Sequence, residues 1–337
     1  MGPGRVNLIG DHTDYNSGRA LPMAIDLGVT VTFVPSDADH LEVTSDAYPG
    51  QRATIPLITD ADRVAGVEPA WARLCAAVAS LARPAVGGAV HVASTVPDGA
   101  GLSSSAALAV ALADVFGVEG GALVVARLCQ AAEHRAGVPV GIMDPLVCAG
   151  GHAGHALWID TATEATRHVP VPPGAAFTVV DSARRRDLRT SPYALRVAEC
   201  EAAAAVVGPL GLAGPADLTA LRDPLLRRRA RHVLTECERV DAFAEALAGS
   251  RLRAAGALMD ASHASLADDF EATTPDVDDL VAHLRSRPGV VGVRMTGAGW
   301  GGCVVALGEP GALDPAGLDL PAWRVNPVDG SVARRSG

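Results

Sequence analysis

The chain has 337 residues, of which 49% are hydrophobic and 20% charged, and its formal net charge is −10 at pH 7. A chain of this length can bury a large core and can form two domains. The negative charge argues against a surface that binds nucleic acid or an anionic membrane, whereas a small phosphorylated ligand needs only a local positive site. No apolar run approaches the ~20 residues of a membrane-spanning helix and no signal-peptide core opens the chain, so we expect a cytoplasmic protein.

Cysteine and lysine usage narrows the classes of site. The six cysteines are dispersed without Cys-x-x-Cys spacing, which indicates reduced, mostly buried thiols and not a disulfide or zinc framework. All 28 basic residues are arginine. A Walker A loop and a protein kinase each require a lysine at the phosphates, so any use of ATP needs another phosphate site.

Residues 4–18 are the first polar stretch of the chain. They combine Arg5, Asp11, His12 and Asp14 with an amide in a glycine-punctuated loop that looks too polar for the core. Carboxylates are the usual groups that hold sugar hydroxyls, so this density of polar groups predicts a binding site. The alternative is a solvated turn capped by Asp and Asn side chains.

A stretch rich in glycine and serine, residues 97–108, joins a predicted strand at 89–96 to a predicted helix at 104–116. Gly99 and Gly101 allow positive φ and a close approach to a ligand, and the serines lie where the first helical N–H groups have no partner. Such a helix start favours phosphate. The alternative is a serine N-cap on an alanine-rich core helix. The candidate phosphate-binding residues are Gly99, Gly101, Leu102, Ser103, Ser104 and Ser105.

A second predicted helix, 121–136, precedes an apolar, glycine-bounded segment that contains one acidic residue, Asp144. Asp144 is either a helix N-cap followed by Pro145 or a charge held for chemistry. His152 and His155 share His-x-x-His spacing, but no third ligand is nearby in the sequence, so we expect no metal there.

The remaining elements are predicted from β-branched runs and apolar spacing. The arginines at 227–229 are expected on a solvated helix face. The glycines at 297–302 lie between two strands, so they indicate a hairpin and not a dinucleotide-binding turn. The predicted strands are 27–33, 41–44, 155–159, 177–181, 290–296 and 303–307; the basic run is 184–186; and the predicted helices are 69–81, one from about Ser191, and several more up to Ser286.

Three separated stretches, 4–15, 101–106 and 295–302, together resemble the galactokinases, a family within the GHMP kinase superfamily. Residues 141–144, 193–201 and 259–266 extend the resemblance over nearly the whole chain. It implies an α/β (α+β) fold of two domains, 1–175 and 176–337, with the active site in the cleft between them. It also implies transfer of the ATP γ-phosphoryl group to the anomeric hydroxyl of galactose.

The resemblance further implies a role for each matching residue. Asp144 resembles the family's catalytic aspartate and Arg5 its partner, while the glycines and serines of 99–105 would surround the ATP phosphates. Ser105 and Glu133 match the ligands of Mg²⁺. The implied sugar-binding residues are Asp11, His12, Asp14, Gly141 and Tyr193.

The chain departs from the family pattern in three ways, and the first two departures bear on the substrate. Asp11 stands where the family usually has Glu, Pro145 stands where it usually has Gln, and family members carry a longer segment before Arg5, which implies a misassigned start or a bare edge. The first two motivate an alternative, a kinase for another aldose, a uronic acid or an amino sugar. A second alternative is a sensor that binds sugar and ATP without turnover. The expected partners are a sugar and ATP, with no nucleic acid and no membrane, and the chain is expected to be a monomer.

Overall fold

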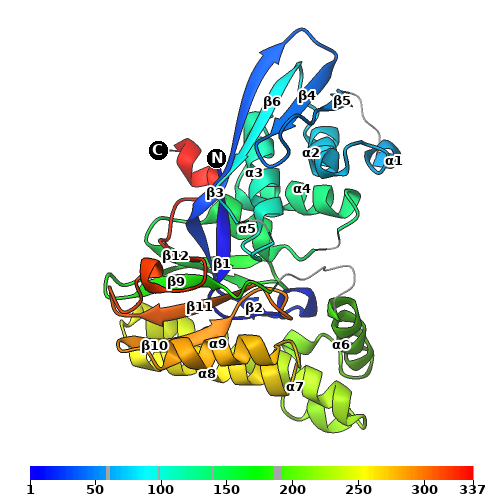
Figure 1. Ribbon diagram of the computed structural model, residues 1–337. Coiled ribbons are helices and arrows are strands. Elements are labelled where there is room, and N and C mark those ends of the chain that lie inside the picture. The colour runs from blue at the N-terminus through cyan, green and yellow to red at the C-terminus, as the bar shows by residue number, and fades with distance from the viewer. Residues whose placement is uncertain (58–60, 98, 139, 185–191, 337) are drawn as a thin grey trace.

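The computed structural model describes residues 1–57, 61–97, 99–138, 140–184 and 192–336. A long twisted sheet with helices beside it forms the upper part of the molecule, and two shorter sheets separate it from a layer of helices below (Figure 1). No helix of the described residues combines the length and the apolar character needed to cross a bilayer.

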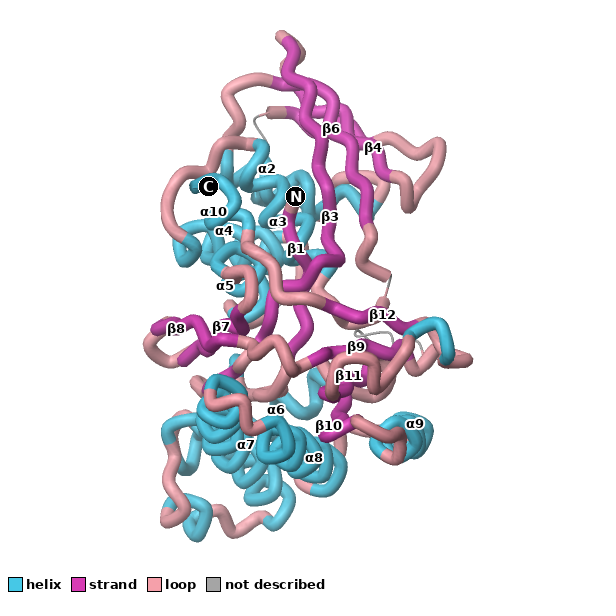
Figure 2. Tube along the Cα trace, turned by 90° about the vertical axis from the view of Figure 1, so that its left-hand side faces the viewer, coloured by secondary structure: helices cyan, strands magenta, loops and turns pink. Residues whose placement is uncertain are grey.

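The upper sheet has five strands in the order β1-β3-β6-β4-β5, and only the β4–β6 pair is parallel. Its helices lie on one side of the strands (Figure 2). The central helix, α3, is fully buried at seven positions, five of them alanine, so its neighbours can approach closely. The elements are β1 (Gly2–Asn7), β3 (Pro22–Ser36), β4 (His40–Ser45), β5 (Ala53–Pro56), α1 (Ala61–Val64), α2 (Arg73–Ala82), β6 (Gly87–Ser94), α3 (Ser104–Val115), α4 (Ala122–Arg135) and α5 (Met143–Gly150).

Two further sheets are entirely antiparallel, with strand orders β2-β7-β8 and β10-β11-β9-β12. Helices α6 to α9 form the lower layer (Figure 1), in which α7 begins at an Asp223 N-cap with Pro224 at its first position. The elements are β2 (Arg19–Ala20), β7 (His155–Asp160), β8 (Ala165–Pro170), β9 (Ala176–Asp181), α6 (Tyr193–Val207), α7 (Pro224–Ala248), α8 (Leu252–Asp268), α9 (Pro275–Arg285), β10 (Val290–Met295), β11 (Cys303–Gly308), β12 (Ala322–Val325) and α10 (Ser331–Ser336).

Most predicted elements are confirmed within a few residues. The two helices after the serine stretch are α3 and α4, and the late glycine-rich turn is a hairpin that joins β10 to β11. Two predictions are wrong. The opening residues 2–7 form a strand, and Asn7, Asp11 and Thr13 are buried, so the 4–18 stretch is not too polar for the core. In the arginine run at 227–229, Arg227 is exposed as predicted, but Arg229 is only 1% exposed and does not lie on a solvated face.

The predicted division into domains 1–175 and 176–337 stays a prediction. One apolar cluster draws on both parts, with Val6 and Ile25 packed in the same group as Phe177 and Phe243. The C-terminal end of the chain returns to the upper part of the molecule. Ile25 pairs with Pro327, and α10 packs against α3 and α5, near the N-terminus in Figure 1. The predicted basic run at 184–186 and the predicted helix start at Ser191 fall largely outside the described residues.

Candidate active site

A bidentate ion pair between Arg5 and Asp144 joins two segments that are 139 residues apart. Nε of Arg5 donates to Oδ1 of Asp144 at 2.7 Å and Nη2 donates to Oδ2 at 2.6 Å. Burial disfavours the charged guanidinium, but the nearby Asp144 carboxylate outweighs it and raises the pKa of Arg5. The Asp144 side chain keeps 24% of its surface exposed, so the pair is accessible from one side.

Asp144 is not an N-cap. It lies in the first turn of α5, whose N-cap position is Ile142, and no side chain caps that helix end. The alternative that explains Asp144 as a cap is therefore wrong. The carboxylate of Asp144 instead contacts side chains of two other segments, Arg5 and Ser103.

The serine loop packs directly against this pair. Nη1 of Arg5 donates to the Gly101 carbonyl at 2.6 Å, and the Arg5 backbone N–H donates to the Leu102 carbonyl at 3.1 Å. Gly99 and Gly101 both have positive φ, 68° and 76°, as predicted. Ser103 takes the N-cap position of α3, but its hydroxyl donates to Oδ2 of Asp144 and caps nothing.

Ser104 begins α3, and Ser105, one residue further, contacts Glu133 of α4. Ser105 Oγ donates to Oε2 of Glu133 at 2.9 Å, while Oε1 is buried without a hydrogen-bond partner. Burial first, and then the Asp144 charge, raise the pKa of Glu133 to about 7. The pair fits Mg²⁺, which in enzymes is held through one or two protein oxygens together with substrate phosphates. Among the described residues, no group of three or more His, Cys, Asp or Glu could hold a metal ion alone.

The Asp11 carboxylate is buried and contacts protein groups. Oδ2 lies 2.7 Å from Nη2 of Arg294 on β10, and Oδ1 accepts from Asn7 Nδ2 at 2.8 Å and from the Gly297 N–H at 3.1 Å. Burial raises the pKa of Asp11, and Arg294 opposes that shift. Asp11 thus links the end of β1, at Asn7, to Arg294 on β10. Its contact with a sugar stays a prediction.

Asp14 and Gly141 lie against each other, as the resemblance implies for two residues of one site. A Cβ added at Gly141 would lie only 2.0 Å from Oδ2 of Asp14. Burial, and then the Asp144 charge, raise the pKa of Asp14 to about 6. Asp14 therefore lies near the Arg5–Asp144 pair, whose charges act on its pKa.

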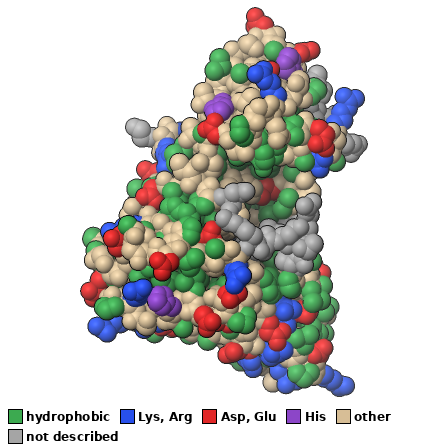
Figure 3. All heavy atoms as spheres, viewed as in Figure 1, with side chains coloured by type: hydrophobic (Ala, Val, Ile, Leu, Met, Phe, Trp, Pro, Cys, Tyr) green, Lys and Arg blue, Asp and Glu red, His purple; other side chains and the backbone are tan. Residues whose placement is uncertain are grey.

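Tyr193, at the start of α6, belongs to a cluster of tyrosine, histidine and phenylalanine rings. Its ring centroid lies 5.8 Å from those of His12 and Tyr15, and His12 Nδ1 is 3.0 Å from the Tyr15 hydroxyl. The ring of Phe270 lies 4.5 Å from that of His12. His12 and Tyr193 thus come together although 181 positions separate them. In the view of Figure 3 the surface of the molecule is hollowed between its upper and lower parts.

Sequence reasoning missed the buried groups that hold the Leu8–Asp11 segment. Glu236 of α7 accepts from the Gly10 N–H at 3.0 Å, and His232 Nε2 lies 3.2 Å from the Asp11 carbonyl. Burial lowers the pKa of His232 to about 4. Burial opposes ionisation of Glu236, but Arg294 and other cationic neighbours lower its pKa to about 2. The sequence does not distinguish His232 and Glu236 from other polar residues, because both lie on α7, whose mixture of polar and apolar residues is that of an ordinary amphipathic helix.

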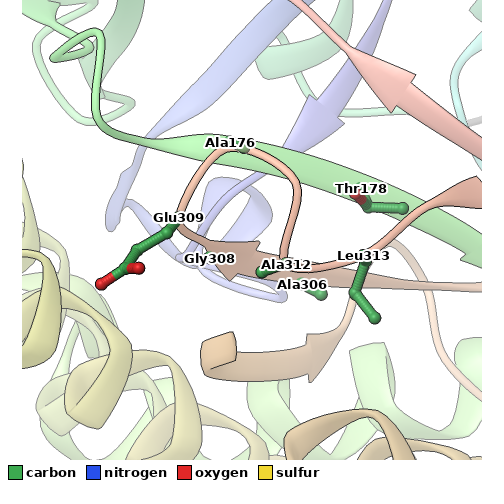
Figure 4. A pocket seen from close by; sticks show the side chains of 7 residues that line it. All are labelled: Ala176, Thr178, Ala306, Gly308, Glu309, Ala312 and Leu313. Carbon is green, nitrogen blue, oxygen red and sulfur yellow. The ribbon is translucent and has the colours of Figure 1, made fainter. Parts of the chain in front are cut away.

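Two other features lie apart from this constellation. His168 stacks on His152 with ring centroids 4.1 Å apart, so a third histidine is near His152 and His155 after all. Within the described part of the chain, these three histidines are not arranged so that they could hold a metal ion together. The small pocket in Figure 4 lies where the paired strands β9 and β11 meet the loop at 309–313, and none of the predicted site residues line it. Its lining residues are Ala176, Thr178, Ala306, Gly308, Glu309, Ala312 and Leu313.

Comparison with known families agrees with this geometry. Residues 69–152 match the GHMP kinases N terminal domain, and residues 243–322 match GHMP kinases C terminal. Mevalonate kinase shares the fold, with a TM-score of 0.69, 20% identity, and coverage of 96% of this chain and 97% of that one. The fold and the matched domains define a GHMP-type kinase with two α/β domains.

More specific matches identify the family within that class. Residues 2–35 match the galactokinase galactose-binding signature. The galactokinase of Mycobacterium bovis (strain BCG / Pasteur 1173P2) is 44% identical over 98% of this chain and 91% of its own length, and that of Homo sapiens is 41% identical over 93% and 84%. The crystal structure of Lactococcus lactis galactokinase complexed with galactose superposes with a TM-score of 0.87 at 28% identity, covering 98% of this chain and 93% of that one. The chain belongs to the galactokinase family.

Proposed function

We propose that this chain transfers the γ-phosphoryl group of ATP to the C1 hydroxyl of galactose. The observation that carries the proposal is the Arg5–Asp144 pair, which is partly accessible and lies directly against the glycine-serine loop. A carboxylate beside a phosphate-binding helix start is the arrangement that phosphoryl transfer to a hydroxyl requires.

In the proposed reaction, Asp144 accepts the proton of the C1 hydroxyl as the C1 oxygen bonds to the γ-phosphorus. The bond from that phosphorus to the β–γ bridging oxygen breaks, ADP leaves, and Asp144 returns its proton to solvent. Arg5 fixes the carboxylate through two hydrogen bonds and lies where its positive charge can stabilise the transferring group. Positioning supplies much of the rate enhancement.

Nucleotide binding is assigned to the serine loop. The positive φ of Gly99 and Gly101 and the start of α3 direct backbone N–H groups toward a phosphate, with Ser103 and Ser104 at the same helix end. Ser105 and Glu133 would hold Mg²⁺, which would neutralise charge on the phosphates. The unpartnered Oε1 of Glu133 supports this assignment.

Sugar binding is assigned to His12, Asp14, Gly141 and Tyr193, with Asp11 beneath them. The carboxylate of Asp14 can accept from two hydroxyls, and epimers are distinguished when such buried groups stay unpaired. We also propose that the chain is a cytoplasmic monomer, and sedimentation of the purified protein tests the monomeric state.

The test measures ADP release with purified protein, Mg²⁺ and a panel of aldoses, uronic acids and N-acetylated sugars. Asp144→Asn should lower kcat by at least about 10³-fold while leaving the galactose dissociation constant within about threefold. Asp319→Asn, at an exposed position, is the matched control. Preference for a sugar other than galactose would show that the proposed substrate is wrong. Binding without turnover by the unmodified protein would contradict the kinase assignment.

A further inference from the structure

Helix α6 carries Tyr193 at its first residue, so the placement of this helix decides where the phenol ring lies. Arg196 follows three residues after Tyr193, and Glu199 three residues after Arg196, so Arg196 is a neighbour of both on the helix surface. Arg196 and Glu199 are nearly buried, with side chains 9% and 12% exposed. The face that directs Tyr193 toward His12 and Tyr15 thus continues into a buried charged cluster.

Glu199 bridges two guanidinium groups with a single oxygen. Its Oε2 accepts from Arg196 Nη1 at 2.7 Å and from Arg229 Nε at 2.7 Å. Arg229 belongs to α7 and is 1% exposed, so the bridge ties α6 to the interior of the lower layer. Charge-assisted bonds of this kind are short and directional, and they fix the orientation of a helix more narrowly than apolar contacts do.

The same charged cluster also contacts Phe270, whose ring packs on His12. Nε of Arg196 donates to the Phe270 carbonyl at 2.6 Å, and the Phe270 ring packs on His12 at 4.5 Å. The Arg196 guanidinium also lies 5.7 Å from the centre of the Trp300 ring, in the glycine-rich hairpin. Arg196 therefore contacts two segments whose rings, Phe270 and Trp300, lie near that of His12, and Glu199 helps to hold Arg196 in that position.

We propose that Glu199 is a positioning residue that sets the affinity for the sugar by fixing the ring of Tyr193 beside that of His12. This inference rests on the proposed function, in which Tyr193 contacts the sugar. Glu199 touches neither substrate; it acts through α6. Apolar packing of Cys200 and Ala203 holds the rest of α6, so loss of the bridge should tilt the start of the helix and leave its body in place.

The test is a double-mutant cycle on the galactose dissociation constant, measured by calorimetry without ATP. Glu199→Gln keeps the shape of the side chain but removes the charge between the two guanidiniums, and it should weaken galactose binding roughly tenfold. In a Tyr193→Ala background the same change should alter binding by less than about twofold. The KM for ATP should stay within about twofold in each variant.

Glu201→Gln is the matched control, because Glu201 is exposed on the same helix and should leave galactose binding unchanged. Thermal unfolding verifies that each variant is folded at the assay temperature. If Glu199→Gln does not fold, Arg196→Lys serves instead, since lysine keeps the charge but loses the planar fork. An equal weakening in the presence and absence of the Tyr193 side chain would overturn this proposal. Absence of galactose binding by the unmodified protein would instead overturn the proposed function.

Discussion

Gly141→Ala tests the packing of the sugar site with the smallest possible change. The added Cβ would lie 2.0 Å from Oδ2 of Asp14, whereas non-bonded heavy atoms meet at about 3.5 Å. The Asp14 carboxylate would therefore have to move by roughly 1.5 Å. Gly141 does not have a positive φ, so its backbone can accept alanine, and the effect should come from this one contact.

A displacement of this size should weaken galactose use about 10–100-fold in kcat/KM, because misplacement of a binding group by about 1 Å can cost two orders of magnitude. The assay is steady-state ADP release with galactose varied at saturating ATP, and then with ATP varied at saturating galactose. The KM for ATP should change by less than about twofold, since Gly141 and Asp14 are assigned to the sugar and not to the nucleotide.

Gly317→Ala is the control, because a Cβ at Gly317 meets nothing within 4 Å and Gly317 lies on a distant turn. If Gly141→Ala retains full kcat/KM for galactose, Asp14 is not held against Gly141 in the active enzyme, and the assignment of both residues to the sugar site is refuted.

Two further predictions concern buried charge. The Glu133 carboxyl has its pKa raised above the ordinary value of 4.5 to about 7, so in metal-free protein its contribution to stability is present below about pH 4.5 and is lost as pH rises through 7. Mg²⁺ needs the carboxylate, so the Mg²⁺ concentration for half-maximal activity should rise about tenfold per pH unit below 7. A pH-independent Mg²⁺ requirement would contradict the metal assignment, and Glu133→Gln should make the loss of stability between about pH 4.5 and 7 smaller than in the unmodified protein. Arg294→Met leaves Asp11 and Glu236 without their buried cation and should lower the free energy of unfolding by about 3–5 kcal/mol in urea titrations. The exposed control Arg253→Met should cost less than about 1 kcal/mol, and an equal loss in the two variants would argue against a buried ion pair.

Local chemistry made several features predictable from the sequence. Glycines at 99 and 101 adopt positive φ because no other residue does so at low cost, and α3 begins where serines replace apolar residues. The late glycine run forms a hairpin because β-branched strands flank it on both sides. These predictions depend on neighbours in the chain, which the sequence displays directly.

Other features could not be predicted locally. The 4–18 stretch is polar by composition, yet it is buried, because partners more than 200 positions away satisfy its polar groups: Glu236 accepts from Gly10, and Arg294 pairs with Asp11. Arg229 had the appearance of a solvated arginine run, but Glu199 and Glu271 pair with it inside the lower layer. Burial of a charge is decided by the groups that meet it, and amphipathic spacing does not name them.

The sequence alone determined the types of residue available for chemistry, the positions of the turns that display them, and the resemblance to the galactokinases. The tertiary structure decided which groups meet. Asp144 could be a cap or a held charge by sequence, and the approach of Arg5 from β1 settles that it is held. Side-chain partners over 139 positions depend on how the sheets and helices pack, and that packing minimises the free energy of the whole chain and not of any local segment.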